Sequence, residues 1–449
     1  MADTPRAESL FQDVMSQFPA LNGHTQLLIG FQLTPETPRS SVVEAIKGAI
    51  AEMVTQIPWL GGQVAREGGS AGILKPAPWP ADAPENLILR VKDCKDLLPS
   101  MAELLYESVP IERLDSKLLS PFPGLSEGHK LSPPVPIVAL QANFLENGLI
   151  LTMCFHHIVM DGTAAVQFIL HLATILNGGR LSSADIEQAN RDRSSVVKLL
   201  SRSEPVKDHS HLRRPPGFMY QAPESAPTWC LFKIPASRVA VLKREASSQS
   251  QLISENDALC AFCWQRISAI RLARGGKQFT SSTISQFHRP IDVRPVVGVP
   301  MSYMGHVVCH AIARLRLGEL VSAPLHKLAQ LLRRELNAAN NEWAVRSYAT
   351  FVAREPDKST LLYGGVTNPN TDLGATSTII GSGDWPLKFG PALGVARFFR
   401  RPRSTPIPGS ISISMVEDGS VPIALCLPEK DIIDLKKDSE WRRYMKHVG

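Results

Sequence analysis

The chain has 449 residues, of which 44% are hydrophobic and 20% carry a charge. These proportions are typical of a folded globular protein, and they exclude long disorder, collagen-like repeats and coiled coils. The 48 Lys and Arg residues against 42 Asp and Glu residues leave a net charge of +6, which is too dilute for a nucleic-acid-binding surface. The length exceeds that of one ordinary hydrophobic core and predicts two domains.

The cysteines and the N-terminal segment bear on the compartment of the protein. Seven scattered cysteines, an odd number, do not form a disulfide framework. The first 16 residues have neither a basic nor an apolar region, so we expect no signal peptide. No apolar run approaches the ~18 residues of a membrane-spanning helix. We therefore expect a cytoplasmic protein without a membrane span.

Hydrophobic periodicity predicts the elements of the first half. Residues 24–33 alternate between apolar and polar, which is typical of a half-buried strand. A helix is predicted from Ser40, with Ser40 or Ser41 as its N-cap and Glu44 completing a capping box. A second helix is expected at about 101–109.

The clearest unit of the first half runs from Asn147 to Gly179. The continuous apolar segment GLILTMCFHH predicts a buried strand, and TAAVQFILHLATIL predicts a helix. The segment HHIVMDG lies between them, so its side chains are expected where a buried strand ends and a helix begins.

The second half follows a change in composition. Residues 186–225 are rich in Ser, Pro and Arg and are predicted to link domain 1–185 to domain 226–449. Helices are expected at 254–274, with Ser254 as N-cap, and at 323–354. Short strands and turns fill the last third. Because strands and helices mix without strict alternation, we expect an α/β protein with layered mixed sheets.

The residues of HHIVMDG leave three interpretations open. A metal site is the weakest, because His157 and Asp161 have no third ligand at a recognisable spacing, and the Cys260–Cys263 pair lies inside a helix without a second pair. The second interpretation is a buried structural histidine. The third is catalysis, because a histidine with a pKa of about 6.5 can act as a base near neutral pH. On this interpretation Gly162 allows a backbone geometry or close approach that a Cβ would block.

Motifs along the whole chain then resemble one superfamily. HHIVMDG matches the HxxxDG motif of the CoA-dependent acyltransferases, which include the BAHD enzymes, the fungal trichothecene 3-O-acetyltransferase-like enzymes and the condensation domains of peptide synthetases. Further segments resemble family motifs in the same order and spacing: SENDALCAFCWQR from Ser254, RPIDVRP at 289–295, YMGHVV at 303–308 and FGPALG at 389–394. The resemblance implies a two-domain chloramphenicol-acetyltransferase-like (BAHD) fold, with an active-site tunnel between the domains.

The resemblance also implies residue roles. His157 corresponds to the general base, which deprotonates the acceptor as it attacks the acyl-CoA thioester in a ternary complex. Asp161 is expected to point away from substrate and to pair with Arg294, and Gly162 completes the loop. His156 is expected to point into the core, since neighbouring strand residues face opposite sides.

Other site residues are weaker candidates. Ser377 and Thr378 are placed where the family often has a hydroxyl for the oxyanion, although they could be ordinary strand hydroxyls. Arg271, Arg274 and Lys277 are candidates for the CoA phosphates, although cations at a helix end also favour the helix dipole.

Two positions depart from the family motifs. Lys388 stands where the family has the Asp of DFGWG, and Asp384 is a conceivable replacement for that charge. His306 replaces the family's Asn after YxG. Because the DFGWG-like motif looks structural and the pair of His157 and Asp161 is intact, an active enzyme is still expected.

Three functions remain. The first is an O-acyltransferase that uses acetyl-CoA, or another acyl-CoA, to acylate a hydroxyl of a fungal secondary metabolite such as a terpenoid, alkaloid or polyketide. The second is a condensation-like or cyclising enzyme on the same fold, for which the paired histidines speak. The third is a binding protein without catalysis. The first is favoured, and for it we expect a monomer with acyl-CoA as co-substrate, a small-molecule alcohol as acceptor, and neither a metal nor a permanently bound cofactor.

Overall fold

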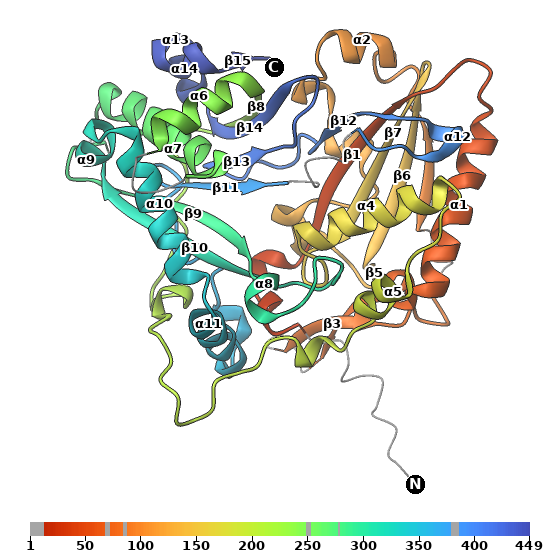
Figure 1. Cartoon of the computed structure of the whole chain (residues 1–449), viewed down its shortest axis with the longest axis horizontal. Coiled ribbons are helices and arrows are strands. Elements are labelled where there is room, and N and C mark those ends of the chain that lie inside the picture. Colours follow the sequence, from red (N-terminus) through yellow and green to blue (C-terminus); the bar gives the residue numbers. More distant parts are fainter. Residues whose placement is uncertain (1–12, 68–71, 84–87, 248–252, 277–278, 379–385) are drawn as a thin grey trace.

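The computed structural model describes residues 13–67, 72–83, 88–247, 253–276, 279–378 and 386–449. Two sheets lie side by side in Figure 1, each with its own helices. Strands and helices are mixed in both, as the sequence predicts. Within the described residues, none of the helices combines the length and hydrophobicity needed to cross a bilayer.

The first sheet has five strands and carries the HHIVMDG segment at one of its ends. Its order is β12 (Ala396–Arg400), β1 (His24–Gln32), β7 (Gly148–His156), β6 (Val138–Leu145) and β4 (Leu89–Asp93). All its neighbouring strands are antiparallel except β4 and β6, which run parallel. The predicted strands at 24–33 and 148–157 are confirmed as β1 and β7.

Both faces of this sheet are covered, which explains why β7 is apolar without alternation. On one face pack α1 (Arg39–Gln56) and α4 (Gly162–Leu176), and α4 lies across the sheet in Figure 1. On the other face α2 (Met101–Tyr106) packs its Met101 and Leu104 against Ile150 of β7. Every residue of β7 is buried as a result.

The second sheet has seven strands and belongs to the C-terminal half. Its order is β10 (Val308–Arg316), β9 (Ile284–Asp292), β11 (Leu373–Ser377), β13 (Ser410–Ile413), β14 (Ser420–Pro428), β8 (Pro227–Pro235) and β15 (Lys446–His447). A separate core forms where this sheet meets its helices, with the fully buried Trp264 of α7 within it. The helices packed here include α6 (Ala236–Ala246), α7 (Glu255–Arg274), α10 (Leu325–Ala339), α13 (Glu429–Lys437) and α14 (Ser439–Tyr444).

The remaining elements are short or peripheral. A three-stranded sheet consists of β3 (Ile73–Ala77), β2 (Gln63–Glu67) and β5 (Val135–Pro136). The other helices are α3 (Ser116–Leu119), α5 (Ser183–Ala189), α8 (Arg294–Val297), α9 (Leu317–Ser322), α11 (Glu342–Arg354) and α12 (Gly390–Leu393).

Some predicted helix boundaries are wrong. α1 begins at Arg39 after Pro38, and no side chain caps it, so the predicted capping box of Ser40 or Ser41 with Glu44 does not form. The predicted helix 323–354 is two helices, because the side chain of Asn341 accepts a hydrogen bond from the backbone of Ala344 and starts α11 anew. Ser254, by contrast, caps α7 through a full capping box, as predicted.

The division of the chain at 185 and 225 stays a prediction. The predicted linker segment contacts α11. The backbone N–H groups of Leu200 and Lys207 donate to the hydroxyls of Thr350 and Ser347 of this helix at 2.8 and 2.7 Å. The C-terminal half also returns to the first sheet, because β12 pairs with β1. The C-terminal half therefore adds one strand to the first sheet, in addition to the predicted linker that connects the two halves.

Candidate active site

His157 is the first residue after β7, and both its backbone N–H and its ring are hydrogen-bonded. Its backbone N–H donates to the carbonyl of Gly23 at 2.8 Å, and its Nδ1 lies 2.9 Å from the carbonyl oxygen of Met160. Since a carbonyl oxygen can only accept, Nδ1 carries the proton. The lone pair of the ring is then on Nε2, the nitrogen that faces away from this bond.

The surroundings of His157 favour its neutral form. Burial lowers the pKa of His157; the hydrogen bond to Met160 and the charge of Asp161 oppose this, and the positive charge of Arg401 adds to the lowering. A neutral imidazole with a free lone pair on Nε2 can accept a proton, as a general base must.

Asp161 and Arg294 form a buried ion pair beside the loop that carries His157. The guanidinium donates from Nη1 and Nη2 to the two carboxylate oxygens of Asp161, both at 2.9 Å, and both side chains are almost completely buried. Burial alone would raise the pKa of Asp161, but Arg294 outweighs it and holds that pKa at about 2. The sequence-predicted pair is therefore present, and the carboxylate is charged and turned away from the ring of His157.

The same carboxylate also joins two segments of backbone. It accepts from the N–H of Ala164, which makes Asp161 the N-cap of α4, and from the N–H of Val307, both at 2.9 Å. Arg294 in turn donates to the carbonyls of Tyr303 and Gly305 at 3.0 and 2.8 Å. The pair therefore fixes the histidine loop, the start of α4 and the YMGH segment against one another.

The backbone at position 162 does not require a glycine. It is exposed, a Cβ built on it would meet no atom within 4 Å, and its φ lies outside the left-handed region. The expectation that a Cβ would be blocked at this position is therefore wrong. What remains of the prediction is its place as the first residue of α4.

His156 lies in the core, as expected from strand alternation. It is completely buried and packs edge-on against the ring of His24, with 5.1 Å between the ring centroids. Burial lowers its pKa well below the usual range, so it stays neutral. Its ring nitrogens have no hydrogen-bond partner among the described residues, whereas its backbone carbonyl accepts from the N–H groups of Val159 and Met160 in the loop.

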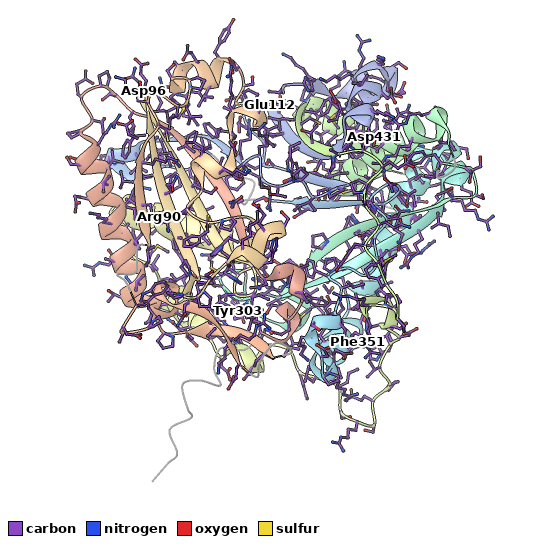
Figure 2. The ribbon with its side chains drawn as sticks, turned by 180° about the vertical axis from the view of Figure 1, so that it is seen from behind. Arg90, Asp96, Glu112, Tyr303, Phe351 and Asp431 are labelled. Carbon is purple, nitrogen blue, oxygen red and sulfur yellow. The ribbon has the colours of Figure 1, made fainter. Side chains whose placement is uncertain are left out.

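His306, the departure from the family's Asn, contacts the base directly. Its Nδ1 donates to the backbone carbonyl of His157 at 3.1 Å, and the two rings lie 5.3 Å apart. Its own backbone N–H points to the carboxylate of Asp13 at 3.3 Å, which also accepts from the hydroxyl of Tyr303 at 3.0 Å and from Arg193. Tyr303 is labelled in Figure 2. Nothing in the sequence marks Asp13 and Arg193, because a buried ion pair between residues so far apart leaves no local pattern.

Arg401 is a second residue that the sequence did not indicate. It follows β12, and its Nε is buried without a hydrogen-bond partner. The adjacent Arg400 differs, because its Nη2 donates to Glu417 at 2.8 Å within a buried ion pair. Burial lowers the pKa of Arg401 to about 10, which still leaves it charged near neutral pH. Its positive charge adds to the effect of burial in lowering the pKa of His157.

The oxyanion candidates lie at the end of β11. Ser377 is its last residue, opposite Ile413 of β13, and the backbone N–H of Thr378 donates to the carbonyl of Ile413 at 3.0 Å. Within the described residues neither hydroxyl is hydrogen-bonded to the His157 loop. Their role as oxyanion donors stays a prediction.

The CoA-binding candidates have partners of their own. Arg271 and Arg274, near the end of α7, donate to Asp431 of α13 at 2.7 and 2.5 Å, and Arg274 also reaches Asp434 at 2.9 Å. Asp431 is labelled in Figure 2. Lys277 and Asp384 lie outside the described residues. A role of these cations in CoA binding stays a prediction. In the structure, both arginines connect α7 to α13 through these ion pairs.

The FGPALG segment docks at the far end of α4 from His157. Phe389 is buried edge-on against Phe31, and the side chain of Asn177 bridges the carbonyl of Lys388 and the N–H of Gly390 at 2.6 and 3.0 Å. The side chain of Lys388 is exposed. Since the 15 residues of α4 span ~22 Å, this segment is remote from the base and contacts α4 structurally.

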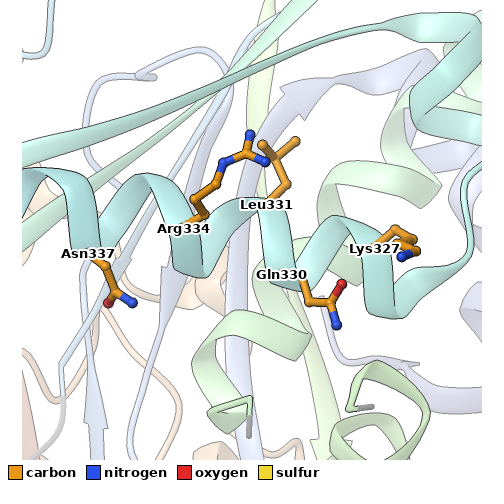
Figure 3. Close-up of a pocket in the computed structure, with 5 residues that line it drawn as sticks. All are labelled: Lys327, Gln330, Leu331, Arg334 and Asn337. Carbon is orange, nitrogen blue, oxygen red and sulfur yellow. The ribbon is translucent and has the colours of Figure 1, made fainter. Parts of the chain in front are cut away.

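A surface pocket of about 450 Å³ lies along α10 and is separate from this site (Figure 3). It is lined by Lys327, Gln330, Leu331, Arg334 and Asn337, all from one helix. None of the residues around His157 contributes to it, so it gives no support to a reaction centre.

The chain matches two family models. Residues 24–174 match the trichothecene 3-O-acetyltransferase-like N-terminal domain, and residues 116–441 match the transferase family. The chain therefore belongs to the transferase family of BAHD acyltransferases, in its trichothecene 3-O-acetyltransferase-like branch, and is an acyltransferase.

Individual relatives agree along the whole chain. It is 39% identical to O-acyltransferase pigD of Monascus ruber, over 98% of both chains, and 37% identical to O-acetyltransferase SAT5 of Stachybotrys chartarum, over 100% of this chain and 98% of that one. Among solved structures it is similar to F. graminearum TRI101 complexed with coenzyme A and deoxynivalenol, with a TM-score of 0.89 and 26% identity over 98% of this chain and 99% of that one. The predicted family and two-sheet fold are thereby confirmed.

Proposed function

We propose that this chain transfers an acetyl group from acetyl-CoA to a hydroxyl of a fungal secondary metabolite, with His157 as the general base. The observation that carries the proposal is the tautomer of His157. With the Nδ1 proton donated to Met160, the lone pair of Nε2 is free to accept a proton. The names of the relatives, an O-acyltransferase and an O-acetyltransferase, support the class of reaction and favour the acetyl donor.

The steps balance without an outside proton source. Nε2 of His157 takes the proton of the acceptor hydroxyl while its oxygen bonds to the thioester carbon of acetyl-CoA. The tetrahedral intermediate then collapses, the C–S bond breaks, and the CoA thiolate leaves. The imidazolium returns its proton to the thiolate, so the products are an acetyl ester and free CoA.

Arg294 and Asp161 support this proposal by their position. They touch neither substrate in the proposed mechanism, but they hold the loop and the N-terminus of α4 on either side of His157. Correct orientation of a base and two substrates supplies a large part of the rate in such reactions. The pair is therefore assigned to positioning.

The test uses isotopically labelled acetyl-CoA and a pooled extract of fungal metabolites. Wild type and His157→Ala run in parallel, and mass spectrometry finds products shifted by the labelled acetyl group. A labelled product from wild type alone supports both the transfer and the base, and it identifies the acceptor. Equal product from both proteins contradicts His157 as the base. Product only from a carrier-bound donor, or without a donor, would favour the condensation-like reaction instead.

We further propose that the protein acts as a monomer in the cytoplasm. Gel filtration with light scattering tests the monomer, and a mass near twice that of the chain would contradict it.

A further inference from the structure

We propose that three histidines, His306, His310 and His288, bind the acceptor by hydrogen bonds. We further propose that they select a neutral molecule that carries several hydroxyl or carbonyl oxygens. We call them the histidine row. The inference rests on the proposed function, since it concerns the acceptor of that reaction. It adds the chemical class that the acceptor must have.

The row begins beside the base and continues into the second sheet. The ring of His306 lies 5.3 Å from that of His157, and Tyr363 follows at 6.3 Å from His306 and 4.1 Å from His310. A continuous line of rings therefore leads from the candidate base to β10.

The last step of the row crosses from β10 to β9. His310 pairs with Pro290 and His288 with Ile312 across the two strands, so the two histidines are diagonal neighbours on one face of the sheet. Gly364 lies against both: a Cβ built on it would be 3.3 Å from His310 and 3.5 Å from His288. At this glycine, whose φ is +77°, the backbone comes close to both rings.

Two nitrogens of the row lack hydrogen-bond partners among the described residues. Nε2 of His306 and Nδ1 of His310 are buried without a hydrogen bond, and the ring of His288 has only the backbone of Gly364 as a nearby partner; only 1% of His306 and 8% of His288 is exposed. Buried polar groups nearly always have a partner, which is protein, water or ligand. No described protein group supplies a partner for the free nitrogens of His306 and His310, so these are open to water or a bound ligand.

A lack of partners alone would not define a site. His156 also has two unpartnered nitrogens, but it is completely buried against His24 and makes none of the contacts of the row. What distinguishes the row is its continuity with His157. An acceptor that extends from the base along the row would meet its free nitrogens.

The charge of the row decides the class of ligand. Burial lowers the pKa of His306 and of His310 to about 3 and lowers that of His288, so all three rings are neutral near pH 7. The charges that act on His288 have opposite signs, Asp372 and Arg314. Nδ1 of His306 already donates to the carbonyl of His157, so its free Nε2 accepts, while the rings of His310 and His288 can donate or accept; such groups suit hydroxyl and carbonyl oxygens rather than a carboxylate or an ammonium group.

A binding experiment tests the row without requiring turnover. Full-length protein with CoA is mixed with the neutral or the acidic fraction of a fungal metabolite extract, and retained molecules are identified by mass spectrometry after ultrafiltration. We expect wild type to retain neutral polyoxygenated molecules, and His310→Leu to retain at least ~10-fold less, the factor for ~1.4 kcal/mol of lost hydrogen bonding. Retention only from the acidic fraction, no retention at all, or equal retention by His310→Leu would overturn the proposal.

Two further variants separate hydrogen bonding from packing. His310→Gln keeps a donor and an acceptor and should restore retention to within about threefold of wild type. His171→Leu removes another buried histidine, in α4 outside the row, and should leave retention unchanged. Thermal unfolding checks that each variant is folded. If His171→Leu lost as much retention as His310→Leu, or if Gln did not restore it, the row would have no specific role.

Kinetics then distinguish this proposal from the proposed function. With an acceptor from the labelled-acetyl screen, His288→Leu should raise KM for the acceptor while leaving KM for acetyl-CoA within about twofold. Retention of neutral molecules without any acetyl transfer would reject the proposed function alone. Transfer by wild type with unchanged acceptor KM in His288→Leu and His310→Leu would reject the row alone.

Discussion

Arg294 donates two parallel hydrogen bonds of 2.9 Å to the carboxylate of Asp161, and the two side chains come from segments 133 residues apart. Neither group touches solvent to any extent, with exposures of 0% and 1%. A charge pair so deeply buried is stabilising only while both partners are present, since either alone would be an uncompensated buried charge.

Removing one partner should therefore unfold the site as well as slow the reaction. For Asp161→Asn and for Arg294→Met we expect a loss of about 3–5 kcal/mol in the free energy of unfolding, measured by urea denaturation. The matched control is Asp115→Asn, which breaks the half-exposed pair with Arg403 and should cost less than about 1 kcal/mol. A loss below that control value for Asp161→Asn would show that the pair is not structural.

The side chain of His306 should hold the loop of the base. His306→Ala removes the hydrogen bond to the carbonyl of His157, and we expect kcat to fall about tenfold, the factor for ~1.4 kcal/mol. His306→Asn, the family's usual residue, has an amide donor and should keep most of the rate. If His306→Ala and His306→Asn were equally slow, the hydrogen bond would not be what matters.

The charge of Arg401 should influence the acidic limb of the pH–rate profile. Arg401 lowers the pKa of His157, so in Arg401→Ala that pKa rises and the acidic limb of kcat/KM moves to higher pH. Asp161 acts in the opposite sense and remains in place. Arg401→Lys keeps the charge and should keep the profile, and Arg403→Ala serves as an exposed control. An acidic limb that did not move, or that moved to lower pH, would contradict this coupling.

Four buried histidines should make the fold sensitive to acid. Burial lowers the pKa of His24 and His209 to about 4 and that of His306 and His310 to about 3. Above pH ~6.5 these groups are neutral in both states, but below it the unfolded chain binds protons that the folded chain does not. Stability should therefore fall from pH 6.5 towards pH 4, by up to ~1.4 kcal/mol per pH unit for each histidine. Urea denaturation at pH 7.5 and 5 measures this, and an unchanged free energy of unfolding would contradict it.

The FGPALG segment offers a matched pair of glycines. Gly390 and Gly394 both have φ of +73°, but only at Gly390 would a Cβ overlap a neighbour, the carbonyl oxygen of Leu176. Gly390→Ala should therefore destabilise the protein by more than the ~1 kcal/mol expected for Gly394→Ala from backbone strain alone. Thermal unfolding compares the two variants. Equal shifts in Tm would show that the segment can move away from α4 without a loss of stability.

The sequence was most informative where chemistry and structure are local. The strand, turn and helix around His157 follow from a continuous apolar run and a helical pattern, and Ser254 caps α7 through residues three apart. The positions of His157, Asp161 and Arg294 follow from motifs rather than from any periodicity. The sequence does not predict the break at Asn341, because an Asn within a helical pattern can be either an exposed residue of one helix or the N-cap of the next.

The remaining features depend on contacts that no local pattern encodes. The return of β12 to the first sheet, the buried Asp13 and the buried Nε of Arg401 each depend on segments that meet only after folding. The histidine row is of the same kind. Its members are spaced irregularly along the chain, and only the pairing of β9 with β10 places His288 beside His310.

The most direct test of the central claim compares acetyl transfer by wild type and by His157→Gln, using the acceptor from the labelled screen. Isothermal titration should give the same Kd for CoA in both proteins, since Gln keeps the loop but cannot act as the base. The rate of transfer should fall about 10²–10⁴-fold, the usual contribution of a general base. A His157→Gln enzyme that transfers acetyl groups as fast as wild type, with CoA still bound, would contradict the account.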